Sequence, residues 1–146
     1  MVGRLLTLYP QYDIMLPGHG SDIVLVGGIL EAVHPKAKGR IVNLCGRTPL
    51  RVLAKIVEKA RLLVGTDSLG IHVAAAVGTP NVCLLGGGHF GRVYPYGDPR
   101  RNRIVCNLMG CYGCNWKCLY DRARCIVEIG TDAVWDQVTA LLSEGR

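Results

Sequence analysis

A strand, a turn and a helix in direct succession constrain the fold of this chain more than any other feature. The apolar run at residues 62–64 is short and β-prone, and a Gly-Thr pair ends it. Asp67 and Ser68 are good helix N-caps, and residues 69–77 are small and apolar enough for a closely packed helix. A glycine and a proline end that helix before the next apolar run, at 82–85. This order is typical of a parallel α/β sheet.

The turn before this helix has the features of an anion-binding site. The first N–H groups of a helix have no partner within it, and the helix dipole favours negative charge there. Ser68 adds a hydroxyl group, and His72 adds an imidazole four residues later on the same face. Three alanines at 74–76 let the helix lie close to the sheet, so its start lies near the carboxyl edge where such sheets bind ligands. The predicted ligand-binding residues are Asp67, Ser68, Leu69, Gly70 and His72.

The sequence GTDSLGIHVAAAVGTP followed by NVCLLG resembles the signature of glycosyltransferase family 9, the lipopolysaccharide heptosyltransferase family. The family pattern is roughly D-[ST]-G-x-x-H-x-A-A-A-x-G-x-P and then an apolar strand, and the resemblance extends from about residue 23 to residue 138. The chain departs from that pattern where Leu69 replaces the usual glycine, with Gly70 next. The resemblance implies a GT-B fold, in which two Rossmann-like domains face a cleft and the C-terminal one binds the nucleotide-sugar donor.

By this resemblance the chain is expected to be the C-terminal, donor-binding half of a glycosyltransferase. Residues 22–146 would form the Rossmann-like domain, and residues 1–21 a poorly patterned remnant too short to supply the family's first strand and helix. The resemblance implies transfer from a nucleotide-diphosphate donor such as ADP-heptose to lipopolysaccharide or another glycan. The general base belongs to the N-terminal domain in the family, so the catalytic residues stay unassigned and we expect the chain alone to be inactive. No cofactor is required by this resemblance, and no divalent metal is implied, since no Asp-x-Asp pair appears.

Further apolar runs predict the rest of the sheet. Residues 22–28 and 40–46 read as strands that end in glycine. A sheet of at least four parallel strands is therefore expected, with helices on both faces, centred on 23–26, 41–44, 62–64 and 82–85. One helix is predicted to begin at Thr48-Pro49. A final amphipathic helix should begin at Thr131-Asp132. Four of its side chains should face the core: Val134, Val138, Leu141 and Leu142.

Two loops add candidates for donor binding. Arg47 and Thr48 follow the second predicted strand, and they are either nucleotide contacts or a helix cap beside a surface arginine. Gly28 follows the first predicted strand, where it is either a tight turn or a place of close backbone approach. The triple glycine at 86–88 is flexible enough to surround a phosphate. It lacks the Lys-Ser/Thr of a P-loop, which argues against an NTPase.

Cysteines cluster after the last predicted strand, within residues 106–125. Four of them have the spacing C-x2-C-x3-C-x6-C, which suits a tetrahedral structural zinc site in part. The alternatives are an iron–sulfur site, or reduced or partly paired thiols, because disulfides rarely persist in the cytosol. The candidate zinc ligands are Cys111, Cys114, Cys118 and Cys125.

Composition limits the remaining classes. The chain has 146 residues, 49% hydrophobic and 19% charged, which is a globular composition. No apolar run reaches the length of a membrane span and no signal peptide is evident, so we expect a cytoplasmic protein with at most peripheral contact at the inner membrane face. The net charge is +6, and residues 87–125 hold seven Lys/Arg against two Asp. This segment suits anionic partners or is simply a solvated face.

Two rival functions stay open on sequence grounds. The first is a non-catalytic, metal-stapled Rossmann-like module that binds a nucleotide or a protein. The second is nucleic-acid binding through the segment around Arg100, Arg101 and Arg103, with tyrosines nearby. No recognisable nucleic-acid motif accompanies this segment, so a nucleic-acid partner is not predicted.

Overall fold

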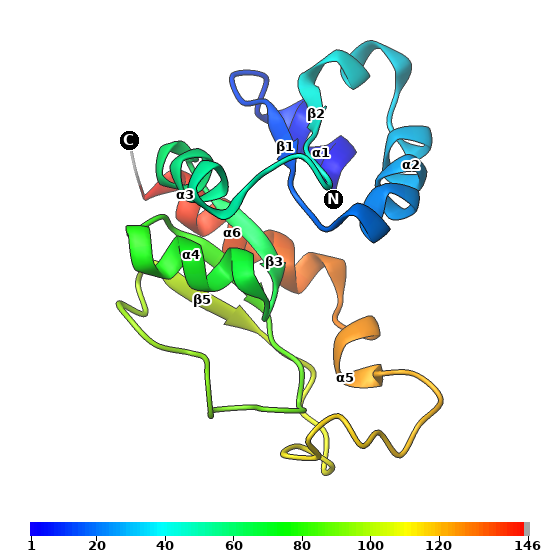
Figure 1. The fold of residues 1–146 in the computed structure, drawn as a ribbon, viewed down its shortest axis with the longest axis vertical. Helices are drawn as coiled ribbons and strands as arrows, with labels where there is room; N and C mark the ends of the chain where they lie inside the picture. The colour runs from blue at the N-terminus through cyan, green and yellow to red at the C-terminus, as the bar shows by residue number, and fades with distance from the viewer. Residues whose placement is uncertain (145–146) are drawn as a thin grey trace. The chain divides into compact units, whose positions relative to one another are not determined.

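The computed structural model describes residues 1–144, and the chain divides into two compact units between Leu53 and Ala54. The first unit contains a two-stranded parallel sheet, in which Ile14 pairs with Ile41. Helices connect and precede these strands (Figure 1). The elements of this unit are α1 (Val2–Leu8), β1 (Ile14–Leu16), η1 (Gly20–Asp22), α2 (Ile23–Ala32), η2 (Pro35–Arg40) and β2 (Ile41–Asn43).

The second unit is built on a three-stranded parallel sheet in the order β3 (Leu63–Thr66), β4 (Asn81–Leu84), β5 (Asn102–Val105). Helix α4 (Leu69–Val77) contacts β3 and β4, whereas α6 (Thr131–Ser143) contacts β4 and β5. In Figure 1, α4 lies in front of these strands and α6 behind them. The predicted α/β architecture, with parallel strands and helices on both faces, is therefore confirmed. The short α5 (Arg124–Val127) precedes α6, and α3 (Leu50–Lys59) contains the boundary between the units.

The core of the second unit lies between α4 and the strands. Ile71, Cys83, Leu85 and Tyr94 form a buried cluster. Burial raises the pKa of the Cys83 thiol to about 12, so this cysteine is an inert part of the core. On the other face, the side chains of α6 that were expected to point inward are all buried: Val134, Val138, Leu141 and Leu142.

A buried polar network joins β4 to β5 and to the segment between them. The Tyr94 hydroxyl donates to Asn81 Oδ1 at 2.8 Å. The Asn81 amide donates in turn to Asn102 Oδ1 at 2.5 Å. Because buried polar groups that lose a partner are costly, this network fixes the position of the Tyr94 ring beside the sheet.

The predicted strand at 23–26 is wrong, because these residues begin α2. The run IVLVGGILEA is apolar throughout, and a continuous apolar run does not distinguish a buried strand from a helix. A turn just upstream favours the helix, since His19 N–H donates to the Asp22 carboxylate at 2.8 Å in a capping box. Gly28 consequently lies inside a helix and not at the end of a strand, which removes the reason for expecting a ligand there.

Residues 1–21 contribute more to the fold than their pattern predicted. They contain α1 and β1, and β1 pairs with β2. The Arg40 guanidinium donates to the carbonyl groups of Leu6 and Tyr9 at 2.8 and 3.0 Å, which ties this segment to the start of β2. Residues 1–21 thus supply a strand before α2, and the compact units divide after residue 53 and not after residue 21.

Strand β5 was missed because its sequence is NRIV, which lies among arginines and reads as a basic surface segment. It is an edge strand, and its Arg103 binds Glu144 at 3.1 Å. The expected single sheet of at least four strands is thus two separate ladders, of two and three strands. Within residues 1–144, no helix is long and apolar enough to cross a membrane.

Candidate functional site at the start of α4

The candidate site lies where β3 ends and α4 begins. Ser68 is the N-cap in an extended conformation, and its side chain makes no capping bond. The first helical bond comes from Ile71 N–H to Ser68 O, at 3.1 Å. The N–H groups of Leu69 and Gly70 precede that bond, so the helix offers them no acceptor. Gly78 ends the helix with φ +79, as its sequence position predicted.

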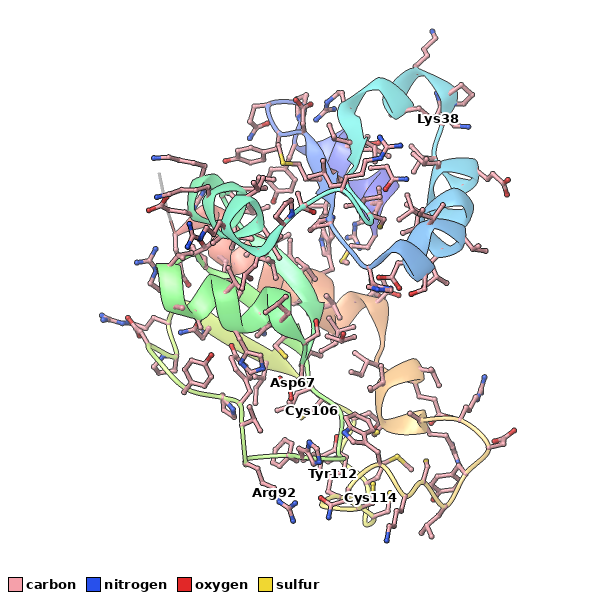
Figure 2. The ribbon with its side chains drawn as sticks, in the orientation of Figure 1. Lys38, Asp67, Arg92, Cys106, Tyr112 and Cys114 are labelled. Carbon is pink, nitrogen blue, oxygen red and sulfur yellow. The ribbon has the colours of Figure 1, made fainter. Side chains whose placement is uncertain are left out.

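Both ring nitrogens of His72 have neighbours. Nε2 lies 3.2 Å from Asp67 Oδ1, and Nδ1 lies 2.9 Å from the Tyr96 hydroxyl. The rings of His72 and Tyr96 are stacked, with centroids 5.8 Å apart and an interplanar angle of 12°. His72 is therefore held between the turn and the chain segment that follows β4. Figure 2 labels Asp67 at the end of β3.

Asp67 differs from its expected part in the turn. Asp67 and Ser68 were both N-cap candidates, and Ser68 occupies the N-cap position. The Asp67 side chain is only 13% exposed, and no group among residues 1–144 meets its Oδ1 at hydrogen-bond angles. Nε2 of His72 is thus close to Asp67 Oδ1 without forming a well-directed hydrogen bond to it.

Tyr94 and Tyr96 complete the surroundings of His72, and sequence reasoning did not place them there. Tyr94 is buried and stands edge-on to both His72 and Tyr96, with centroids 6.1 and 5.5 Å away. The Tyr94 ring lies in the core, whereas the Tyr96 ring, two residues later in the chain, lies at the surface and is 44% exposed. That alternation was visible in VYPYG, but nothing local links it to a histidine 24 residues upstream.

The triple glycine after β4 is a packing surface. A Cβ on Gly87 would lie 2.1 Å from the Tyr112 ring, and one on Gly88 would lie 2.4 Å from the Trp116 ring. Gly113 N–H donates to Gly87 O at 2.7 Å. The cysteine-rich loop, residues 106–125, is therefore bonded to these glycines through its backbone. The interpretation of a flexible phosphate loop is therefore wrong. These positions are glycines because aromatic rings occupy the space that a side chain would need. Figure 2 shows Tyr112 and Cys114 in this loop.

The cysteines of this loop surround Tyr112 in part. Burial raises the pKa of the Tyr112 hydroxyl to about 12, and the nearby thiols of Cys106, Cys125 and Cys111 add to the shift. Cys125 is buried and its sulfur accepts from Gly87 N–H at 3.4 Å, while Cys118 is exposed. Among residues 1–144, no three His, Cys, Asp or Glu side chains gather into a group that could hold a metal. The zinc ligand set proposed from the spacing stays a prediction without support from this geometry.

Arg47 and Thr48 lie in the first unit, in the turn after β2. The Thr48 hydroxyl donates back to Leu44 O at 3.2 Å, which is a local bond within the turn. Gly46 has φ +69 and a Cβ there would meet Gly20 at 3.2 Å, so this turn is closely packed. The contribution of Arg47 and Thr48 to donor binding stays a prediction.

The basic segment is partly neutralised within the protein. Arg100 binds Asp98 at 3.0 Å, and this pair lowers the pKa of the Asp98 carboxyl group. Arg103 and Arg124 bind glutamates at 3.1 and 2.7 Å. Exposed pairs of this kind contribute little to stability, but they reduce the field available to a polyanion. This favours the interpretation of residues 87–125 as a solvated face.

The sequence profile described as glycosyltransferase family 9 (heptosyltransferase) matches residues 6–123, which is most of the chain. The chain belongs to this family. The structure of E. coli ADP-heptose lps heptosyltransferase II matches 98% of this family 9 chain with a TM-score of 0.79 and 23% identity. A family 9 glycosyl transferase from Veillonella parvula DSM 2008 matches 99% of it with a TM-score of 0.74 and 20% identity. This chain covers 40% and 39% of those two proteins, and the likeness shows that it shares their fold.

Curated relatives are also heptosyltransferases by name. The family 9 chain is 33% identical over 79 residues to lipopolysaccharide heptosyltransferase 3 of Escherichia coli. The matched region covers 49% of this chain and 23% of that protein. The chain is 20% identical over 137 residues to lipooligosaccharide heptosyltransferase 2 of Campylobacter jejuni, covering 93% and 43% respectively. The chain therefore spans less than half the length of these relatives.

Proposed function

We propose that this chain is the donor-binding part of a glycosyltransferase of GT-B type. The whole enzyme would transfer a sugar from a nucleotide-diphosphate donor, of the ADP-heptose kind, to lipopolysaccharide or a related glycan acceptor. The observation that carries the proposal is the start of α4, where N–H groups without a helical acceptor lie beside His72 at the end of a parallel strand. Membership of family 9 and the names of its heptosyltransferase relatives support the choice of donor.

The site would act on the leaving group. As the bond between sugar and diphosphate breaks, negative charge increases on the diphosphate. The N–H groups of Leu69 and Gly70 and the imidazole of His72 would offset that charge without a metal ion. The acceptor hydroxyl needs a general base, which we assign to the part of the enzyme that faces this site. Such an enzyme would work in the cytoplasm, at the inner face of the membrane.

A calorimetric comparison of nucleotides tests this function. We expect ADP to bind the chain about tenfold more tightly than AMP, because only ADP has the second phosphate group that reaches the N–H groups of α4. UDP and GDP show how strongly the base contributes. A short single-stranded oligonucleotide at physiological salt is the control for non-specific attraction to the basic segment. Equal affinity for ADP and AMP, or tighter binding of the oligonucleotide, would contradict the proposal.

A further inference from the structure

We propose that Tyr96 is a positioning residue that places the ring proton of His72 on Nε2. This inference rests on the proposed function, because the proton on Nε2 is the one offered to a phosphate oxygen. The Tyr96 hydroxyl lies 2.9 Å from Nδ1, and the two rings are stacked with an angle of 12° between them. A phenol hydroxyl is a good donor, and a neutral imidazole has one acceptor nitrogen and one N–H group. Tyr96 O–H therefore donates to Nδ1, and the proton of the ring stays on Nε2.

The proton on Nε2 is not fully used inside the protein. Nε2 is close to Asp67, at 3.2 Å from Oδ1, but Oδ1 has no hydrogen-bond partner among residues 1–144. The Nε2–H bond is thus near the carboxylate and not directed at it. Asp67 favours a proton on Nε2 by its charge, and since its Oδ1 does not accept that proton at hydrogen-bond angles, the proton is left for a phosphate oxygen. The His72 side chain is 29% exposed, so a ligand can reach the ring.

The segment that carries Tyr96 is held firmly enough to orient a ring. Tyr94 is almost fully buried, and its hydroxyl is bonded to Asn81 in the network between β4 and β5. Gly97 has φ +82 and a Cβ there would lie 2.6 Å from the Asn102 amide, so the chain after Tyr96 is closely packed as well. Tyr96 is anchored on both sides, although its own ring is partly exposed. Such partners fix which nitrogen of a histidine carries the proton.

Tyr96→Phe tests this inference, because it keeps the stacked ring and removes only the hydroxyl group. Tyr120→Phe is the matched control, since Tyr120 is also partly exposed but lies in the cysteine-rich loop, where it stacks on Arg124. The first measurement is the ¹⁵N spectrum of the His72 ring in the 146-residue chain without ligand. We expect one tautomer, protonated on Nε2 with a hydrogen-bonded Nδ1. In Tyr96→Phe, the Nδ1 signal should move and a second tautomer should appear.

The second measurement is the affinity for ADP. Tyr96→Phe should weaken ADP binding by about three- to tenfold, the usual effect of one hydrogen bond, while Tyr120→Phe leaves it unchanged. A proton on Nδ1 in the parent chain, or a changed tautomer with unchanged ADP affinity, would overturn the inference. If the parent chain does not bind ADP at all, the proposed function fails, and the ring spectrum alone then decides whether Tyr96 sets the tautomer.

Discussion

Gly87→Ala should lower the free energy of unfolding by about 3 kcal/mol, which is a shift of the melting temperature by about 6–12 °C in a chain of this size. The reason is steric, because the added Cβ would lie 2.1 Å from Cδ1 and 2.5 Å from Cε1 of the Tyr112 ring. The hydrogen bond from Gly113 N–H to Gly87 O holds that ring in place. The loop therefore cannot move away from Gly87 without breaking this hydrogen bond. Thermal and urea unfolding of the purified variant measure the effect.

Gly110→Ala is the matched control, because a Cβ at that glycine would have no atom within 4 Å. It should melt close to the parent chain. The double variant Gly87→Ala/Tyr112→Ala should be less destabilised than the sum of its single changes, since removing the ring removes the clash. If Gly87→Ala is as stable as Gly110→Ala, the cysteine-rich loop does not pack on the triple glycine.

His72→Ala should weaken ADP binding by about five- to 150-fold, the range for a charge-assisted hydrogen bond of about 1–3 kcal/mol. The variant loses the Nε2–H group beside Asp67 and leaves the N–H groups of α4 in place. Stability should change little, because the His72 side chain is partly exposed. Calorimetric titration with ADP and a thermal melt of each variant measure the two effects.

His89→Ala is the matched control, because it removes another histidine of the second unit. His89 stands edge-on to Trp116 and belongs to the loop after β4, so its removal should leave the ADP affinity within about twofold of the parent. A His72→Ala variant that binds ADP as well as the parent but melts much earlier would make His72 a core residue, and the proposed site would be misplaced.

The predictions from sequence succeeded where local signals were sufficient. In the segment from β3 through α4 to β4, N-cap candidates precede the helix and Gly78 ends it. The order and type of these elements were therefore predictable from neighbours in the chain. The strand itself extends through Gly65 and Thr66, which were expected to end it. A glycine at the carboxyl end of a parallel strand is compatible with pairing, and here Gly65 pairs with Cys83.

The errors have two kinds of physical origin, an ambiguous local pattern and contacts between distant segments. The apolar run of α2 has no period that separates helix from strand, and the arginines around β5 concealed an edge strand. The reason for three glycines at 86–88 lies in rings that come from a distant part of the chain. Tyr96 likewise meets His72 only after the fold has formed. Contacts between segments far apart in the sequence decide the packing of the glycines and the place of Tyr96, and composition or spacing within one segment does not reveal them.

An amide NMR titration with ADP tests the central claim most directly, because it reports where on the chain the diphosphate binds. We expect the ¹⁵N–¹H signals of Ser68, Leu69 and Gly70 to shift with ADP, while adenosine, which has no phosphate, leaves them nearly unchanged. The His72 ring signals should shift together with these amides. Shifts confined to the arginine-rich segment at residues 100–103, with the start of α4 unaffected, would contradict the assignment of a diphosphate site to this helix.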